Sequence, residues 1–389
     1  MTPQRIYCDY NATAPLRPEA RDAIDQVLAA TGNPSSVHAE GRRARATVEN
    51  ARERLAAAIG ACRDDIAFTS GGTEAVSDCL KGATRAMDVR FRILASELEH
   101  DAVATLAGPL SGWHVNADGA VCLDWLRGCV GDFVRGGHRP LVSLMLVNNE
   151  TGVIQPVARA AAIVREAGGL IHCDAVQGLG KVPIAVMDLD VDYLSLSAHK
   201  IGGPQGVGAF YVKPGAPFAA IQTGGGQEFG RRAGTENVAG IAGFAAAVQA
   251  ADTGLTDYEA LRTSRDRMEV ALKAAAPSLK VHGAEAPRVA GVSCFGVEGL
   301  PSETQIMGLD LAGVAVSAGS ACSSGKVKPS RVLTAMGASE TAARSAIRAS
   351  FGWATAPHDF EGLAHAWLKM AARARPHLMN REVLANVGR

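Results

Sequence analysis

The sequence Ser197-Ala198-His199-Lys200-Ile201-Gly202-Gly203-Pro204 determines how the rest of the chain is interpreted. It follows the apolar segment Val191–Leu196, so the pattern places Lys200 just beyond the end of a predicted strand. A lysine in that position can be partly desolvated and held near a bound phosphate, which are the conditions under which an amine forms a Schiff base. A lone lysine after a strand is more often a solvated surface residue. The serine, histidine and glycines around it favour the phosphate site, because hydroxyl and imidazole groups donate to phosphate oxygens and glycines allow close backbone approach.

Strand-like and helix-like segments alternate through the first two thirds of the chain. Buried strands are predicted at Ile66–Thr69, Leu141–Val147, Leu170–Cys173, Val191–Leu196 and Val207–Val212, with a crossover helix at Ala158–Ala167. Such alternation is typical of an α/β fold in which helices cover both faces of a mostly parallel sheet.

The pattern changes at Asp252-Thr253-Gly254. A long charged helix is predicted at Tyr258–Ala275, followed by short strands at Val289–Phe295 and Val314–Ser317. Further helices are predicted at residues 302–310, 339–347 and 358–373. We therefore expect a large α/β domain at residues 13–253 and a smaller α+β domain built from residues 1–12 and 254–389.

Composition excludes several classes of function. The 389 residues carry 39 basic and 39 acidic side chains, which argues against a nucleic-acid or membrane-surface binder. No apolar segment reaches the length of a transmembrane helix and the N-terminus lacks the apolar region of a signal peptide, so a cytoplasmic protein is expected. The eight cysteines include no Cys-x-x-Cys pair, and no metal site is predicted. All of them except Cys322 are expected to be small buried residues in a reducing compartment.

Asp174 is the second residue that points to a cofactor. It follows the predicted strand Leu170–Cys173, and the carboxyl ends of parallel strands are where α/β folds hold ligands. Pyridoxal phosphate requires such a carboxylate to keep its ring nitrogen protonated. Lys200 comes 26 residues later (200 − 174), which leaves room for one crossover and one strand, so both can reach one edge of the sheet. Alone, Asp174 would be explained as the cap of the next helix.

Three further motifs are suited to the same site, although each has a simpler explanation. Ser70-Gly71-Gly72-Thr73-Glu74 is a glycine-rich loop at a predicted helix N-terminus, suited to bind phosphate or to form a tight turn. His100 follows a strand end, where an imidazole can stack on an aromatic cofactor and move protons, or simply lie on the surface. The amides of Val147–Gly152 are suited to bond a cofactor oxygen or a substrate carboxylate, or to form an asparagine-rich turn.

Two residues of the second domain point to a substrate. Arg348 is flanked by apolar residues, and a buried arginine requires an anionic partner, which is either a substrate carboxylate or a structural ion pair. Cys322 lies on a loop, at about residues 317–330, in which every neighbour from 317 to 325 is small. An accessible thiol near a lysine, here Lys326, is the environment of a reactive thiolate rather than of a core cysteine.

Together these motifs resemble those of the cysteine desulfurases, which are fold-type I pyridoxal-phosphate enzymes of the class V aminotransferase superfamily. The likeness extends over nearly the whole chain. The matching segments are Asp9–Pro15, Gly32–Ser36, Ser70–Glu74, Leu98–His100, Val147–Gly152, Cys173–Gln177, Ser197–Pro204, Arg232–Asn237, Ser317–Cys322 and Arg348. The resemblance implies pyridoxal 5′-phosphate as the cofactor and a mostly parallel sheet of seven strands flanked by helices.

The resemblance also implies a role for each matching residue. Lys200 would hold the cofactor and, with His100, move protons, while Cys322 would take sulfur from the substrate and become a persulfide. The implied cofactor-binding residues are Lys200, Asp174 (ring nitrogen), Gln177 (ring hydroxyl), His100 (stacked on the ring), Gly72, Thr73, Ser197 and His199 (phosphate), and Thr235, which would reach the phosphate of the neighbouring subunit in a homodimer. The implied substrate-binding residues are Asn149, Arg348 and Asn11.

The implied reaction converts L-cysteine to L-alanine and leaves a persulfide on Cys322, whose sulfur passes to an acceptor such as an iron–sulfur cluster scaffold. Thirteen residues, Cys322 through Thr334, lead into Ala335-Met336-Gly337, which is similar to the longer-loop group that serves nitrogenase-type and general iron–sulfur assembly. The chain stops soon after the predicted helix at Trp367–Leu378, a departure from the housekeeping members that favours the nitrogen-fixation type.

Two alternatives stay open at the level of the sequence. One is another class V enzyme, such as a selenocysteine lyase or an aminotransferase, which would keep Lys200 and Asp174 but would not need Cys322. The other is a non-enzymatic paralogue that acts as a scaffold or regulatory subunit, against which the intact cofactor and nucleophile residues argue. The identity of the sulfur acceptor is also left open.

Overall fold

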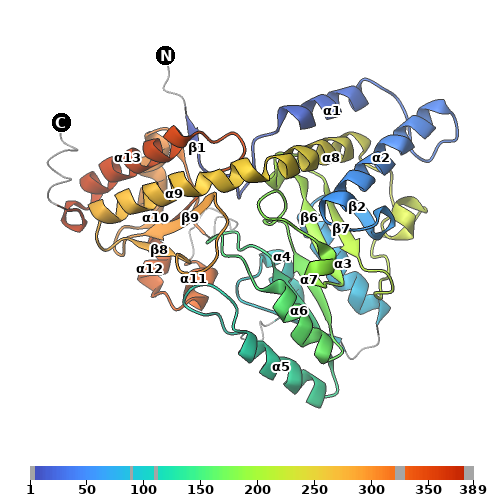
Figure 1. The fold of residues 1–389 in the computed structure, drawn as a ribbon, viewed down its shortest axis with the longest axis horizontal. Coiled ribbons are helices and arrows are strands. Elements are labelled where there is room, and N and C mark those ends of the chain that lie inside the picture. Colours follow the sequence, from blue (N-terminus) through green and yellow to red (C-terminus); the bar gives the residue numbers. More distant parts are fainter. Residues whose placement is uncertain (1–4, 88–90, 109–112, 320–328, 381–389) are drawn as a thin grey trace.

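Figure 1 shows the computed structural model, which describes residues 5–87, 91–108, 113–319 and 329–380. Among these residues, the central sheet has six strands in the order β2-β7-β6-β5-β4-β3. The strands are β2 (Ile66–Thr69), β3 (Phe91–Ala95), β4 (Arg139–Met145), β5 (Leu170–Asp174), β6 (Tyr193–Ser197) and β7 (Gly208–Val212). β3 to β6 pair in parallel, whereas β7 is antiparallel to both of its neighbours. The mostly parallel sheet is confirmed, but the described residues form six strands rather than the expected seven.

The helices surround this sheet and the smaller unit beside it. They are α1 (Pro18–Leu28), α2 (Ala39–Ala58), α3 (Gly72–Ala86), α4 (Asp101–Ala107), α5 (Leu123–Arg135), α6 (Val157–Glu166), α7 (Val186–Leu189), α8 (Val238–Thr253), α9 (Leu255–Ala275), α10 (Ser302–Leu311), α11 (Arg331–Ala335), α12 (Glu340–Ser345) and α13 (Pro357–Ala374). Within the described ranges, no single helix is long and apolar enough to cross a membrane; only α8 and α9 together pass that test, by length and composition, and they are bent by 62°.

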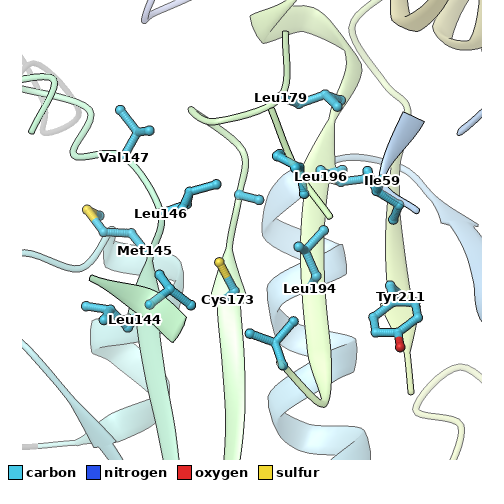
Figure 2. Close-up of a cluster of buried hydrophobic side chains, with 14 of the residues drawn as sticks. Ile59, Leu144, Met145, Leu146, Val147, Cys173, Leu179, Leu194, Leu196 and Tyr211 are labelled. Atoms are coloured by element: carbon cyan, nitrogen blue, oxygen red, sulfur yellow. The ribbon is translucent and has the colours of Figure 1, made fainter. Parts of the chain in front are cut away.

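Residues that alternate along the central strands belong to two separate cores. Leu141 and Tyr193 pack on one face with α3 and α4. Val142, Cys173 and Leu194 pack on the other face with α6 and α8, and Figure 2 shows part of this second core. Both faces of the sheet are therefore covered, which explains why apolar side chains of these strands are buried on both faces. The polar side chains of Ser143, His172 and Ser195 are buried among them and hydrogen-bond to one another.

A smaller unit stands beside the central sheet, at the end of α9 that lies away from α8 (Figure 1). Its antiparallel sheet has the order β11-β9-β8, formed by β8 (Lys280–His282), β9 (Val292–Gly296) and β11 (Ala346–Ser350). The strand β1 (Ile6–Tyr7) pairs in parallel with β10 (Val314–Ala315), so these two residues near the N-terminus join this unit. The unit has its own hydrophobic core, which includes the fully buried Trp367. The exact domain boundaries remain the prediction made from the sequence.

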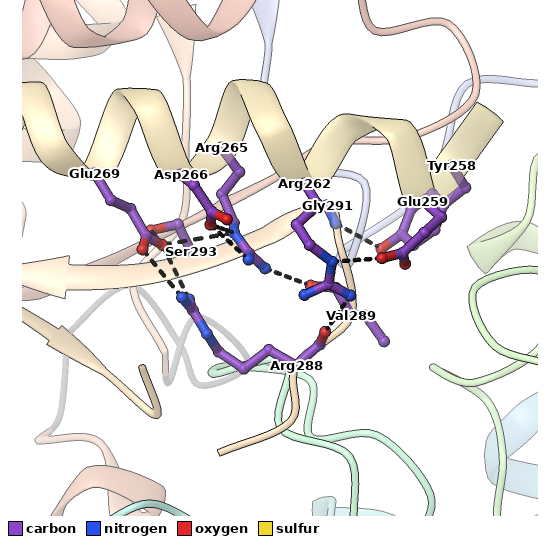
Figure 3. Close-up of polar contacts among 10 residues, drawn as sticks. All are labelled: Tyr258, Glu259, Arg262, Arg265, Asp266, Glu269, Arg288, Val289, Gly291 and Ser293. Carbon is purple, nitrogen blue, oxygen red and sulfur yellow. Dashed lines mark hydrogen bonds and ion pairs between the residues drawn. The ribbon is translucent and has the colours of Figure 1, made fainter. Parts of the chain in front are cut away.

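Buried ion pairs attach α9 to this second sheet (Figure 3). Glu269 accepts hydrogen bonds from both terminal nitrogens of Arg288 (2.9 and 3.0 Å) and from Ser293 Oγ (2.7 Å). Arg265 donates to the carbonyl oxygen of Val289 at 2.8 Å. Since β9 pairs directly with β11, these contacts help to fix the strand that carries Arg348.

One sequence-based helix prediction was partly wrong. Residues 339–347 were expected to be helical throughout, but α12 ends at Ser345 and β11 begins at Ala346. The alanines of this stretch favour a helix, yet pairing with the buried strand β9 decides the conformation of its last residues.

Candidate active site

A cavity of about 350 Å³ opens at the carboxyl ends of β4, β5 and β6. The strands bring these ends together because they are parallel and paired in register, with Met145 opposite Asp174 and Asp174 opposite Ser195. β6 ends at Ser197, and the short 3₁₀ turn η2 (Ala198–Lys200) then brings Lys200 to the cavity wall. The predicted site residues that line the cavity are Asn11, Gly72, Thr73, His100, Asn149, Asp174, Gln177, Ser197, His199, Lys200 and Arg348.

Of the remaining two predicted site residues, one lies outside this cavity and the other lies outside the described residues. Thr235 does not line it and is exposed to solvent. Cys322 lies outside the described residues, so the structure gives it no position. The residues on either side of that segment are described, and Gly319 lines the cavity. The expectation that the remaining cysteines are buried is wrong for Cys62, which is exposed, and Cys122 and Cys129 are only partly buried.

The amine of Lys200 is held by the N-terminal segment of the chain. Its Nζ donates to the carbonyl oxygens of Asn11 (2.7 Å) and Ala12 (2.8 Å). The neighbouring His199 has its Nδ1 3.2 Å from Thr13 Oγ1. Burial, and secondarily the positive charge of Lys200, lowers the pKa of His199 to about 4. His199 is therefore a neutral imidazole at pH 7, which can donate one hydrogen bond and accept another.

Asp174 lies buried at the end of β5, and its Oδ1 accepts a hydrogen bond from the backbone N–H of Val176 at 3.0 Å. Burial raises the pKa of Asp174, and the hydrogen bond from Val176 and the positive charge of Lys200 oppose that rise. The Nδ1 atom of His100 accepts from the N–H of Ala102 at 3.1 Å and so caps α4. The neutral ring of His100 must therefore carry its proton on Nε2. A buried carboxylate of this kind is suited to pair with a cationic ring nitrogen.

The first turn of α3 and the end of β6 form a cradle suited to a phosphate group. Ser197 Oγ is buried and has no hydrogen-bond partner among the described residues, so a polar ligand group would complete its bonding. A Cβ added at Gly72 would lie 3.0 Å from Val176 Cγ2 and 3.2 Å from Ser197 Cβ, so a side chain would fill this space. The N–H groups at the start of α3 lie at the same place and attract an anion. These residues fit the phosphate of the expected cofactor.

Arg348 reaches the cavity from the second sheet and is almost fully buried. Its terminal nitrogens donate to the carbonyl oxygen of Asn149 (3.0 Å) and to Asp9 Oδ1 (2.8 Å). The other carboxylate oxygen of Asp9 accepts from Ser317 Oγ at 2.7 Å. The ion pair that the sequence left open therefore exists, with Asp9 as the partner. The Nε–H of Arg348 remains buried without an acceptor in the described part of the chain, which leaves a donor available for a ligand carboxylate.

The family model for class-V aminotransferases matches residues 6–363, which is most of the chain. The chain belongs to the class V aminotransferase family. It is 42% identical over 364 residues to a cysteine desulfurase of Cereibacter sphaeroides, covering 91% of this chain and 92% of that one.

Solved structures of similar proteins agree with this family assignment. A NifS-like protein from Rickettsia africae matches with a TM-score of 0.85 and 29% identity over 94% of this chain and 99% of that one. A structure described as SspA in complex with cysteine matches with a TM-score of 0.75 and 27% identity over 89% of this chain and 98% of that one. The resemblance inferred from the sequence motifs, and the fold expected from it, are confirmed.

Sequence reasoning missed three polar residues of this class V site. Lys181 donates hydrogen bonds to the side chains of Asn11 and Gln177, Asp9 holds Arg348, and Glu99 Oε1 accepts from the backbone N–H at the end of β4. Lys181 stands four residues after Gln177, a spacing that puts two side chains on one side of a helical turn and could have indicated the contact. Asp9 and Glu99 lie inside segments that match the family, but nothing in their immediate sequence names their partners.

Glu150 lies next to residues on both sides of segment 320–328, which is outside the described residues of this class V protein. Its Oε2 accepts from Ser330 Oγ at 2.5 Å, after the segment. Before the segment, a Cβ added at Gly319 would lie only 1.9 Å from the same Oε2, so a residue with a side chain would displace the carboxylate. Burial raises the pKa of Glu150, and the hydrogen bond from Ser330 and the charge of Arg348 oppose that rise. The carboxyl group therefore contacts both ends of the segment that carries Cys322.

Proposed function

We propose that this chain is a pyridoxal-phosphate-dependent cysteine desulfurase, which converts L-cysteine to L-alanine and transfers the sulfur through a persulfide on Cys322. One observation carries the proposal: Lys200, Asp174 and the cradle with the unpartnered Ser197 hydroxyl line the same cavity as Arg348. An amine, a buried carboxylate, a phosphate cradle and a carboxylate receptor are together what a pyridoxal-phosphate enzyme acting on an amino acid requires. The cysteine desulfurase similar to this chain over 92% of its own length supports the choice of reaction.

The residues of the cavity would hold the cofactor as follows. Lys200 would bind it covalently, Asp174 would pair with its ring nitrogen, Gln177 with its ring hydroxyl, and His100 would stack on the ring, while Gly72, Thr73, Ser197 and His199 would bind its phosphate. When bound, pyridoxal phosphate withdraws electrons from the α-carbon of the substrate, so that bonds at that carbon and its neighbour can break. Lys200 would also act as the base that removes the α-proton of the substrate.

The substrate would be held at the other end of the cavity. Arg348 would bind the α-carboxylate of L-cysteine through its buried guanidinium, with Asn149 and Asn11 beside it. The thiolate of Cys322 would attack the substrate sulfur, so that a sulfur–sulfur bond forms as the carbon–sulfur bond breaks. The carbon then takes a proton and leaves as L-alanine, and Cys322 keeps the sulfur as a persulfide.

Three further parts of the proposal concern the oligomeric state of the enzyme, its sulfur acceptor and its cellular compartment. Thr235 is exposed and stands outside the cavity of its own chain, which supports a role in the phosphate site of a second copy in a homodimer. The acceptor of the sulfur would be another protein, and we favour an iron–sulfur cluster scaffold. Among the groups of cysteine desulfurases, we favour the nitrogen-fixation type for this chain. We also propose that the enzyme acts in the cytoplasm.

The test measures L-alanine and sulfide formed from L-cysteine in the presence of a thiol reductant. Wild-type protein should form both, and Cys322→Ala should form neither above background. Cys62→Ala is the matched control because Cys62 is exposed and does not line the cavity, and it should behave as wild type. Wild-type rates from Cys322→Ala would refute the desulfurase mechanism and favour a lyase. Pyruvate released with sulfide and ammonia instead of alanine would likewise indicate a β-eliminating lyase, whereas 3-mercaptopyruvate, which keeps the sulfur, would indicate an aminotransferase.

A further inference from the structure

Lys181 is a buried lysine that hydrogen-bonds to two amide side chains next to the cavity. It is 7% exposed, and its Nζ donates to Asn11 Oδ1 at 2.7 Å and to Gln177 Oε1 at 2.6 Å. Among the ion pairs of the described residues, none joins Lys181 to an acidic side chain. Burying an amine is costly unless it is fully hydrogen-bonded, so a lysine kept here needs a function that an apolar side chain could not supply.

The amine dictates which end of each amide points toward the cavity. A lysine Nζ bonded in this way is a donor, so the oxygen ends of Asn11 and Gln177 must face it. The NH₂ ends then point the other way, where Gln177 Nε2 donates to the carbonyl oxygen of Asn11 (3.0 Å) and Asn11 Nδ2 donates to the carbonyl oxygen of Asn149 (2.9 Å). If either amide were reversed, its NH₂ group would face the donor amine. That amide would then lose its hydrogen bond from Lys181 and its hydrogen bond to the backbone carbonyl oxygen. One side chain therefore selects the orientation of two cavity residues.

The same network includes the lysine that would carry the cofactor. The carbonyl oxygen of Asn11 accepts from Gln177 Nε2 and also from Lys200 Nζ, at 2.7 Å. Lys181 itself does not line the 350 Å³ cavity, so it can act there only through its neighbours. Burial lowers the pKa of Lys181 well below its usual value, and the positive charges of Lys200 and Arg348 add to that effect.

We propose that Lys181 is a positioning residue that orients the Gln177 and Asn11 amides toward the cofactor and toward Lys200. The inference rests on the proposed function, because it assigns the ring hydroxyl of pyridoxal phosphate to the NH₂ end of Gln177. Without Lys181, the Gln177 amide can turn, and the cofactor loses a correctly aimed donor. A misplaced hydrogen bond of this kind is worth about one kcal/mol or slightly more, which corresponds to roughly a tenfold loss of cofactor affinity.

The experiment titrates cofactor-free protein with pyridoxal phosphate and records the visible absorbance band and its dependence on pH. Lys181→Met should weaken binding about tenfold and shift the pH at which the band changes, since a nearby amine is removed. Lys213→Met is the control, because Lys213 pairs with Asp190 at 2.7 Å far from the cavity lining, and it should bind the cofactor as wild type does. Lys181→Gln, which keeps a donor, should lie between wild type and Lys181→Met and serves if the methionine variant folds poorly.

A double-mutant cycle separates positioning from a general structural role. In a Gln177→Ala background, Lys181→Met should change cofactor affinity by much less than it does in the wild-type background, because the residue it orients is gone. Equal losses in the two backgrounds, or wild-type affinity and pH dependence in Lys181→Met, would overturn the inference while leaving the proposed function intact. Wild-type protein that fails to bind pyridoxal phosphate at all would overturn both.

Discussion

Glu269→Gln is expected to destabilise the second unit strongly, because Glu269 is the shared partner in the network of Figure 3. Its carboxylate is nearly buried and accepts hydrogen bonds from both terminal nitrogens of Arg288 and from Ser293 Oγ. Arg265 is also close, with its Nε 3.9 Å from Glu269 Oε1. The substitution keeps the shape of the side chain and removes its charge, so it isolates the electrostatic contribution.

The magnitude follows from the burial of the partners. The side chain of Arg288 is 6% exposed and that of Arg265 is 3% exposed, so water cannot replace the lost carboxylate. Arg265 retains Asp266, at 2.7 Å and half exposed, but Arg288 loses its bidentate partner. Breaking a buried ion pair by removing one charge costs about 3–5 kcal/mol, and we expect a loss near the lower end because the glutamine oxygen keeps one hydrogen bond.

The assay is urea-induced unfolding of the cofactor-free protein at a fixed protein concentration, followed by tryptophan fluorescence, to which the buried Trp367 of this unit contributes. Glu166→Gln is the matched control. Glu166 pairs with Arg127 on the surface, where the two side chains are 63% and 59% exposed, and such a pair contributes about 0–1 kcal/mol. If Glu269→Gln were as stable as the control, the argument from burial would fail.

Three further predictions concern the site and its surroundings. Gly72→Ala should weaken cofactor binding by about 1–3 kcal/mol in an equilibrium titration, because the new Cβ would crowd Val176 at 3.0 Å; unchanged affinity would contradict the cradle. Ser330→Ala should slow persulfide formation on Cys322 in a single turnover but leave the cofactor spectrum unchanged, because it removes the hydrogen bond at one end of that segment; equal rates would show that the contact is unimportant. Burial raises the pKa of Asp78 from 3.8 to about 6, so the folded state binds the proton more tightly and loses stability as pH rises from about 4 to 6. Asp78→Asn should therefore stabilise the protein above pH 6 by about 1–2 kcal/mol, after discounting for nearby cations, and have little effect below pH 4 in thermal unfolding at both pH values.

The site residues at the edge of the central sheet were predictable, because they lie at the ends of strands or just after them. Asp174 and Ser197 end apolar strands, and Lys200 comes three residues after the second of them, so local patterns were enough to place them at one edge. The glycines of the phosphate cradle were likewise visible, since the loop before α3 needs close backbone approach.

The contacts that hold these residues were not predictable, because they join segments far apart in the chain. Lys181 meets Asn11 across 170 positions, and Arg348 meets Asp9 across 339. No local pattern specifies such partners, and they appear only when the N-terminal segment lies between the two units. The strand at Ala346–Ser350 was mistaken in part for a helix for the same reason, since its pairing partner is about fifty residues away.

The most direct test of the account is mass spectrometry of the Cys322 peptide after one turnover with L-cysteine, without reductant. Wild-type protein should gain one sulfur atom on Cys322 for each L-alanine formed, and Lys200→Ala, which cannot hold the cofactor covalently, should gain none. Alanine formed at the wild-type rate with no sulfur on Cys322, or a Cys322 persulfide formed equally well by Lys200→Ala, would contradict the central claim that this cavity and this thiol act together.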